Sequence, residues 1–361
     1  MKNLSFLFLI VASFVACKSS GNKETDEYSG ATVTEGEEPH LANIQQLTYG
    51  GDNAEAYFSF DNSKLVFQSN NPAWGLECDQ IFYMNIEEAI KDTLRPPMLS
   101  TGLGRTTCSY FLPGDSLIVY ASTHEGGDAC PQETKDSTRY LWSVFGDYDI
   151  YVADLNGNIV SKLTDEPGYD AEATVSPNGD RIVFTSDRSG DLELYTMNLD
   201  GSDVVQVTSG LGYDGGAFYS PNGEELIFRS SRPTSEEEIA DYKELLSRGL
   251  VAPTDMELYI CNVDGSNLRQ ITELGQANWA PFFHPSGEKI IFSSNHASER
   301  GFPFQLYMID TTGENLQQIT TRSVFNAFPM FSFDGKKLIF SSNRDNGGTR
   351  ETNLFIADWV D

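Results

Sequence analysis

The sequence predicts an all-β fold: a six-bladed β-propeller of four-stranded antiparallel blades. Three observations support this prediction. One unit of short strand-like runs recurs six times, the same kind of turn follows the first run of every unit, and the start of the repeat region supplies a run that the last unit lacks. Repeated four-stranded units indicate propeller blades, because each unit buries its faces against its neighbours.

The first run of each unit is apolar and ends in a tight turn. The clearest copies read ATVSPNGDRIVF from Ala173 and APFFHPSGEKIIF from Ala280. Proline presets φ for such a turn and glycine or asparagine accepts a positive φ, so these segments predict hairpins between first and second strands. The six turns lie at residues 59–62, 112–115, 176–179, 220–223, 284–287 and 332–335.

The third run of each unit ends in Asp or Asn, where a short polar side chain can bond nearby backbone and open the hairpin to the fourth strand. The position before it is apolar in every unit, including Cys261, and is expected in the core of the blade. The six polar positions are Asn85, Asp154, Asn198, Asn262, Asp310 and Asp358.

The last unit has three runs and no fourth. Residues 42–48 (ANIQQLT) match residues 314–320 (ENLQQIT), which form the fourth run of the fifth unit. We therefore expect the N-terminal strand to complete the last blade and close the ring, which removes an exposed sheet edge. The propeller is expected to span residues 41–361.

The repeats resemble a known family. The phrases SPNGDRIVFTSDR at 176–188 and LYTMNLDGS at 194–202 are similar to the WD-like repeats of TolB-type propellers. The resemblance covers roughly residues 41–361 and implies a six-bladed ring. Propellers of this kind serve as binding platforms, as accessory domains of peptidases and occasionally as lyases, so the fold does not choose a function.

The first residues read as targeting segments. Residues 1–16 have a basic start, an apolar core too short to span a bilayer, and small residues before Cys17, as in a signal peptide. Cys17 resembles the lipidated cysteine of bacterial lipoproteins, with ordinary secretion as the alternative. Polar residues 18–40 predict a disordered tether. Because Lys18 follows the cysteine, we expect an outer-membrane lipoprotein of the bacterial envelope, facing the periplasm or the cell surface.

The chain is strongly acidic. It carries 53 Asp and Glu against 24 Lys and Arg, a formal net charge of −29. This charge argues against nucleic acid and against direct contact with an anionic membrane, so the lipid is the expected membrane contact. The expected partners are an envelope protein, a peptide or a glycan.

Three cysteines are expected near the junction of the first and second blades. Export permits disulfides, and we expect one among Cys78, Cys108 and Cys130, with Cys108 as a partner. The sequence does not fix the pairing. A metal-thiolate site is the alternative.

Long insertions fall between the second and third strands of three blades, at residues 124–145, 233–254 and 296–303. Loops of this type share one face of a propeller, and long loops on a rigid scaffold commonly carry binding sites. Ser235 and Glu238 form a capping box, which predicts a short helix on this face. Arg188, Arg232 and Arg344 recur after second strands and are expected to form ion pairs between blades.

The innermost strands begin on the insertion face, so their first residues are expected around the channel mouth. Their oxygens would suit a divalent cation, with Asp170 and Asp214 as candidate ligands, and their aromatic rings would suit a sugar or peptide. Alternatively, the Asp and Asn side chains cap turns between blades. The predicted binding residues are Asn53, Arg105, Thr106, Tyr169, Asp170, Glu172, Tyr213, Asp214, Asn278, Trp279 and Asn326.

Motifs for a nucleophilic serine, a zinc peptidase or a phosphate loop are absent from the sequence. Oligogalacturonate-type propeller lyases use a histidine-based metal cluster, which the four histidines here do not present. Glu172 with Asp170 and Tyr169 is the candidate acid/base set. The sequence favours a non-catalytic binding or scaffold propeller, with a lyase or hydrolase at the channel mouth as the alternative.

Overall fold

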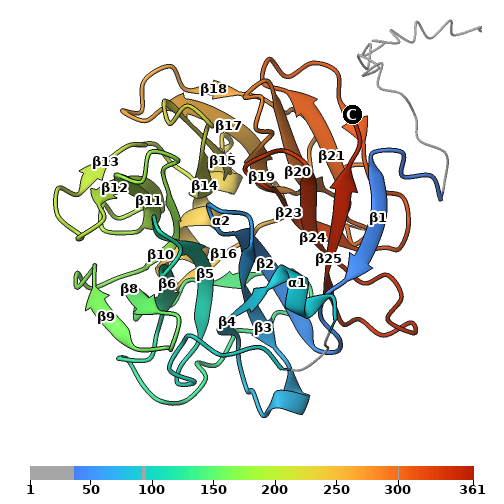
Figure 1. Ribbon diagram of the computed structural model, residues 1–361. Helices are drawn as coiled ribbons and strands as arrows, with labels where there is room; N and C mark the ends of the chain where they lie inside the picture. Colours follow the sequence, from blue (N-terminus) through green and yellow to red (C-terminus); the bar gives the residue numbers. More distant parts are fainter. Residues whose placement is uncertain (1–35, 92–94, 300) are drawn as a thin grey trace, which may run out of the picture.

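The computed structural model describes residues 36–91, 95–299 and 301–361. Six antiparallel sheets form its blades, and Figure 1 shows the blades arranged in a ring around a common axis. The all-β propeller prediction is therefore confirmed. The predicted signal peptide, Cys17 and the tether up to residue 35 lie outside the described residues. No helix in the described ranges is long and apolar enough to cross a membrane.

Four consecutive blades follow the predicted order, with the first strand innermost and each later strand paired to the one before it. Their strands are β5 (Thr106–Phe111), β6 (Leu117–Ser122), β8 (Asp149–Asp154) and β9 (Ile159–Lys162) in blade two; β10 (Asp170–Val175), β11 (Arg181–Ser186), β12 (Glu193–Asn198) and β13 (Val205–Gln206) in blade three; β14 (Asp214–Tyr219), β15 (Glu225–Ser230), β17 (Glu257–Asn262) and β18 (Arg269–Gln270) in blade four; and β19 (Asn278–Phe283), β20 (Lys289–Ser294), β21 (Gln305–Asp310) and β22 (Gln317–Gln318) in blade five.

Blade six is closed by the N-terminal strand. It consists of β23 (Asn326–Phe331), β24 (Lys337–Ser342), β25 (Asn353–Trp359) and β1 (Leu41–Gln46). β1 runs antiparallel to β25, and Figure 1 shows the two side by side. The predicted closure is confirmed.

Ordered contacts begin before Leu41, inside the segment expected to be a tether. The carboxylate of Glu38 pairs with Arg344 at 3.0 Å, and both side chains are almost fully buried. The imidazole of His40 stacks on Trp359 with the ring centroids 5.1 Å apart. Residues 36–40 therefore fasten the closing strand to the ring.

Blade one departs from the four-stranded pattern. It contains β2 (Asp52–Phe58), β3 (Lys64–Asn70) and β4 (Gln80–Asn85), with η1 (Pro72–Trp74) before β4 and α1 (Ile86–Ala89) after it. A single bridge between Phe82 and Met98 stands where the fourth strand is expected. Pro96 and Pro97 precede Met98, and proline has no N–H to donate to a strand ladder.

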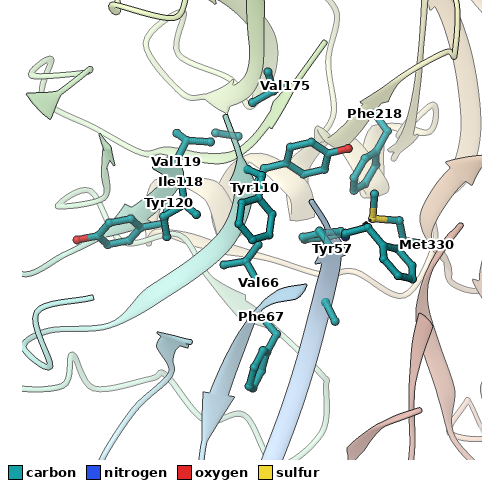
Figure 2. Packing of buried hydrophobic residues seen from close by; sticks show 14 of the residues in the cluster. Tyr57, Val66, Phe67, Tyr110, Ile118, Val119, Tyr120, Val175, Phe218 and Met330 are labelled. Carbon is teal, nitrogen blue, oxygen red and sulfur yellow. Dashed lines mark hydrogen bonds between the residues drawn. The ribbon is translucent and has the colours of Figure 1, made fainter. Parts of the chain in front are cut away.

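The core lies within and between the blades, and Figure 2 shows part of its largest cluster. The penultimate residue of each innermost strand points towards the channel axis. The Tyr57 ring lies 5.7 Å from that of Tyr110 and 5.5 Å from that of Phe218. We call this layer the plug; its members are Tyr57, Tyr110, Thr174, Phe218, Phe282 and Met330.

Two insertions meet on one face of the ring. The predicted helix is present as α2 (Glu236–Ser247), with its capping box between Ser235 and Glu238. After it, β16 (Leu250–Val251) pairs with β7 (Trp142–Ser143) of the other insertion. Figure 1 shows α2 and β16 near the centre of the ring. We call residues 124–145 and 233–254 together the roof.

One disulfide joins the roof to blade one. It links Cys78 and Cys130, whose Cα atoms are 5.8 Å apart. A disulfide among the three candidate cysteines is thus confirmed, but the expectation that Cys108 takes part is wrong. Cys108 lies at an irregularity of β5 that turns its side chain into the channel. Cys261 is buried in its blade, as predicted.

Candidate binding cavity

A cavity of about 400 Å³ lies between the roof and the plug. The roof contributes Trp142, whose indole lies 5.1 Å from that of Trp279 on β19. The plug contributes Tyr57 and Phe218. The cavity is therefore covered by the insertions, and the plug forms its floor.

A repeated backbone feature forms much of the cavity wall. Each innermost strand carries a β-bulge, and one residue of each bulge has a positive φ between 44° and 62°. A bulge re-aims the side chain it contains, and a positive φ in non-glycine residues is uncommon outside special sites. All six bulge residues line the cavity; they are Glu55, Cys108, Glu172, Gly216, Ala280 and Phe328.

Six of the predicted binding residues lie two positions before these bulge residues in the sequence. They are buried and do not line the cavity. Asn53 donates hydrogen bonds to the carbonyl oxygens of Gly50 and Thr352, both at 3.0 Å. Thr106 donates to the carbonyl of Asp79 at 2.9 Å. In this structure these positions brace the connections between blades. The residues placed there are Asn53, Thr106, Asp170, Asp214, Asn278 and Asn326.

The two candidate metal ligands are each engaged by an arginine. Asp170 accepts two hydrogen bonds of 2.9 Å from Arg188, and Asp214 pairs with Arg232 at 2.6 Å. Each of these pairs lies within its own blade, so the expectation of ion pairs between blades is wrong for Arg188 and Arg232. The reason is that the arginine follows the second strand, which is hydrogen-bonded to the innermost strand. Among the described residues, no group of three or more His, Cys, Asp or Glu side chains is placed to hold a metal ion.

Five predicted residues do line the cavity: Arg105, Tyr169, Glu172, Tyr213 and Trp279. Arg105 pairs with Asp79 at 3.7 Å and also contacts Glu133. The structure thus brings together these five side chains, from blades two to five, and leaves the other six beneath the wall.

Glu172 is the centre of a buried hydrogen-bond network between blades three and four. It accepts hydrogen bonds from the Tyr213 hydroxyl at 2.6 Å, from Thr185 at 2.8 Å and from the Gly216 amide at 2.7 Å, and it pairs with Arg229. A Cβ on Gly216 would lie 1.9 Å from Nη1 of Arg229, so a side chain there would displace the guanidinium from this position. Both carboxylate oxygens are therefore fully used in holding Arg229 and Tyr213.

Arg229 is enclosed by rings as well as by charge. Its guanidinium lies 5.1 Å from the ring centre of Trp142 and 5.3 Å from that of Tyr213. Cation–π contacts of this kind strengthen when water is excluded. Arg229 thus connects β15 of the ring to the roof above it.

Glu55 has a different environment. Its Oε2 atom is buried and has no hydrogen-bond partner in the structure. Burial raises the pKa of Glu55 to about 7, although the Cys108 thiol and the charge of Arg229 act in the opposite direction. Burial and the nearby carboxylates raise the pKa of the Cys108 thiol well above its usual value, so the thiol stays protonated.

Comparisons with known proteins agree with the fold. Residues 138–248 match the family model PD40, described as the TolB beta propeller domain. The structure of putative TolB from Agrobacterium tumefaciens has a TM-score of 0.57 and 19% identity, over 86% of this chain and 91% of that one. TolB from Acinetobacter baumannii has a TM-score of 0.55 and 18% identity, over 83% of this chain and 64% of that one.

The fold of the chain is similar to that of these TolB propellers. The structure of an oligogalacturonate lyase in complex with manganese is similar too, with a TM-score of 0.51 and 14% identity over 92% of this chain and 96% of that one. No curated protein matches the chain. At these identities the structural likeness establishes the fold of this chain alone and leaves its ligand to be argued from the cavity.

Two prominent cavity residues, Trp142 and Arg229, were not anticipated from the sequence, and Glu55 was not singled out as a binding residue. The sequence did contain a signal for Arg229. It is a charged residue in a second strand, at a position where blades five and six have Ser293 and Ser341. Trp142 lies in an insertion without a repeat to align. The repeat places Glu55 at the same position as Glu172, but strand alternation alone does not reveal the bulge.

Proposed function

We propose that the protein is a non-catalytic binding propeller, anchored in the bacterial envelope through Cys17. It holds part of a peptide, glycan or partner protein in the cavity beneath the roof. The observation that carries this proposal is the cavity itself, which is concave, walled by aromatic rings and supplied with a few buried polar groups. Ligand sites of proteins commonly have this composition.

The construction of the cavity supports capture of a ligand. The plug closes its floor, so a ligand enters and leaves on the insertion face. The roof is held by the β7–β16 pairing, by the Cys78–Cys130 disulfide, and by Arg139, which donates two hydrogen bonds of 2.7 Å to Asp241. A preformed site loses less conformational entropy when it binds.

The alternative function, a lyase or hydrolase at the channel mouth, needs a carboxylate that is free to exchange a proton. Glu172 accepts hydrogen bonds at both oxygens and is held by Arg229, whereas Asp170 lies outside the cavity wall and is bonded to Arg188. The candidate acid/base pair is therefore not assembled in one place. This geometry argues against catalysis by Glu172 and Asp170.

The experiment is a screen of defined peptide and glycan arrays with the folded domain, repeated with two variants. Trp142→Ala removes a cavity wall, and Tyr49→Ala removes an exposed ring outside the cavity. We expect Trp142→Ala to weaken every retained ligand by about tenfold or more, as for a central interface aromatic, and Tyr49→Ala to leave binding unchanged. Equal binding by Trp142→Ala would refute the proposal. Cleavage of an array glycan that is lost in Glu172→Gln would instead support the catalytic alternative.

A further inference from the structure

We propose that the cavity recognises a ligand by an ammonium group on an apolar stem, such as a lysine side chain, with Glu55 as the counter-charge. This inference rests on the proposed binding function and names the chemistry of its ligand. It follows from the charges of the cavity, the unpartnered oxygen of Glu55 and the aromatic rings around it.

The charged side chains of the cavity leave one carboxylate unbalanced. Arg229 pairs with Glu172 across blades three and four, and Arg105 pairs with Glu133 at the rim. Among the described residues that line the cavity, Glu55 is the remaining charged side chain, and no ion pair involves it. A buried charge without a partner is costly, so a cation of the ligand would be stabilised there.

The backbone directs Glu55 inwards. Its φ of 53° belongs to the bulge of β2, which opens the register between Ala54 and Tyr57. The Oε2 atom of Glu55 is buried without a hydrogen-bond donor. Buried polar atoms in native proteins nearly always have a partner, so an unpartnered one indicates a position that a ligand donor can fill.

The surroundings of Glu55 suit an ammonium group better than a larger anion or a bare apolar group. The charged and titratable groups that act on it are Cys108, Arg229, Glu172 and Asp79. Two of these, Glu172 and Asp79, are carboxylates, the Cys108 thiol is neutral, and Arg229 is already held by Glu172, so the site repels an anion. Two of the rings lining the same cavity interact with the Glu55 charge; they are Tyr57 and Tyr148.

Aromatic rings stabilise an ammonium group through their faces and an alkyl stem through burial. Burial, with the Glu55 carboxylate as a further cause, raises the pKa of Tyr57 and Tyr148 well above the usual value, so both hydroxyls stay neutral. The site therefore combines one carboxylate with neutral rings. A cavity of about 400 Å³ is large enough for one long side chain.

The test is calorimetry with three probes at about pH 8. They are N-acetyl-lysine methylamide, its neutral counterpart N-acetyl-norleucine methylamide, and free n-pentylamine. We expect the lysine probe to bind and the norleucine probe to bind at least about tenfold more weakly, because charge-assisted hydrogen bonds are the strong ones. Pentylamine distinguishes two sources of the ammonium group. If pentylamine binds as well as the lysine probe, the natural ligand is a free amine. If pentylamine binds more weakly, the natural ligand is a peptide side chain.

The matched variants are Glu55→Gln and Glu314→Gln, the second an exposed glutamate on a distant turn. Glu55→Gln should weaken the lysine probe by about tenfold or more, and Glu314→Gln should not change it. Binding of the wild type should weaken as the pH falls below about 7, because Glu55 becomes protonated. Circular dichroism and thermal unfolding show whether each variant is folded.

Three results would overturn the inference: equal affinity for the lysine and norleucine probes, wild-type affinity in Glu55→Gln, or no binding of either cationic probe. The array screen keeps this failure separate from failure of the proposed function. Array ligands that depend on Trp142 but bind equally to wild type and Glu55→Gln would leave the binding function standing and remove the ammonium site.

Discussion

Replacing Glu55 by Gln should stabilise the protein at neutral and alkaline pH and have little effect in acid. Burial holds the folded-state pKa at about 7, whereas the unfolded chain releases the proton near 4.5. Between these pH values the folded state binds more protons at Glu55 than the unfolded chain does. The contribution of Glu55 to the free energy of unfolding is therefore fully present below about pH 4.5 and is lost as the pH rises through about 7. Glutamine is neutral throughout and keeps that stability.

The size of the effect follows from the pKa difference. A shift from 4.5 to about 7 corresponds to about 3 kcal/mol once Glu55 is ionised in both states. The same relation gives a difference of less than about 1 kcal/mol at about pH 5, where the folded protein keeps the proton. Because Glu55 is half-buried, about 3 kcal/mol is an upper value.

The assay is urea unfolding of wild type and Glu55→Gln at about pH 5 and about pH 8, followed by tryptophan fluorescence and circular dichroism. Glu193, whose pKa burial also raises to about 7, is present in both proteins and cancels in the difference. A stability difference that does not change between the two pH values, or a variant less stable than wild type at pH 8, would refute this account of Glu55.

Three further substitutions test the supports of the cavity and the ring. Arg229→Met should destabilise the fold by about 3–5 kcal/mol, because it leaves the buried Glu172 carboxylate without its counter-charge; urea unfolding measures this. Replacing Cys78 and Cys130 together by alanine should cost about 2–4 kcal/mol, because the disulfide closes a loop with a sequence separation of 52; thermal unfolding with and without reductant measures it. Glu38→Ala should cost about 3 kcal/mol, because the buried Arg344 then loses the carboxylate that it pairs with; hydrogen exchange of β1 measures it.

Each of these variants has a matched control. The double variant Arg229→Met with Glu172→Met removes both buried charges and should recover part of the loss. Cys108→Ser changes the free cavity thiol and should leave the response to reductant unchanged. Glu37→Ala, next to Glu38 but exposed, should leave β1 protected. Loss of protection in Glu37→Ala equal to that in Glu38→Ala would contradict the role assigned to the buried pair.

The repeat made the architecture predictable. The turns of the SPNG type, the six strand triplets and the match between residues 42–48 and 314–320 together predicted both the number of blades and the closure by β1, which the structure confirms. These features are local and recur in phase, so each copy corroborates the others. Blade one shows the limit of this reasoning, since Pro96 and Pro97 stop its fourth strand from forming a ladder.

The cavity was predicted less well, for a geometric reason. Regular alternation placed Asn53 and Asp170 at the channel, but both are buried beneath the cavity wall, and the bulge that follows turns Glu55 and the predicted Glu172 towards the cavity. A bulge adds a residue without a strong sequence signal, since Glu, Cys, Ala and Phe all occupy it here. The same shift explains Cys108, which faces the channel and leaves Cys130 to pair with Cys78.

The closing strand has a mechanical consequence. If Cys17 is held in a membrane and the cavity holds a partner, tension between them enters the ring through residues 36–40 and β1. That seam is secured by non-covalent contacts, the buried Glu38–Arg344 pair, the His40–Trp359 stack and the β1–β25 ladder. A pull from the anchor would therefore load the one blade that is assembled from both ends of the propeller, and the seam would set the force that the ring can bear.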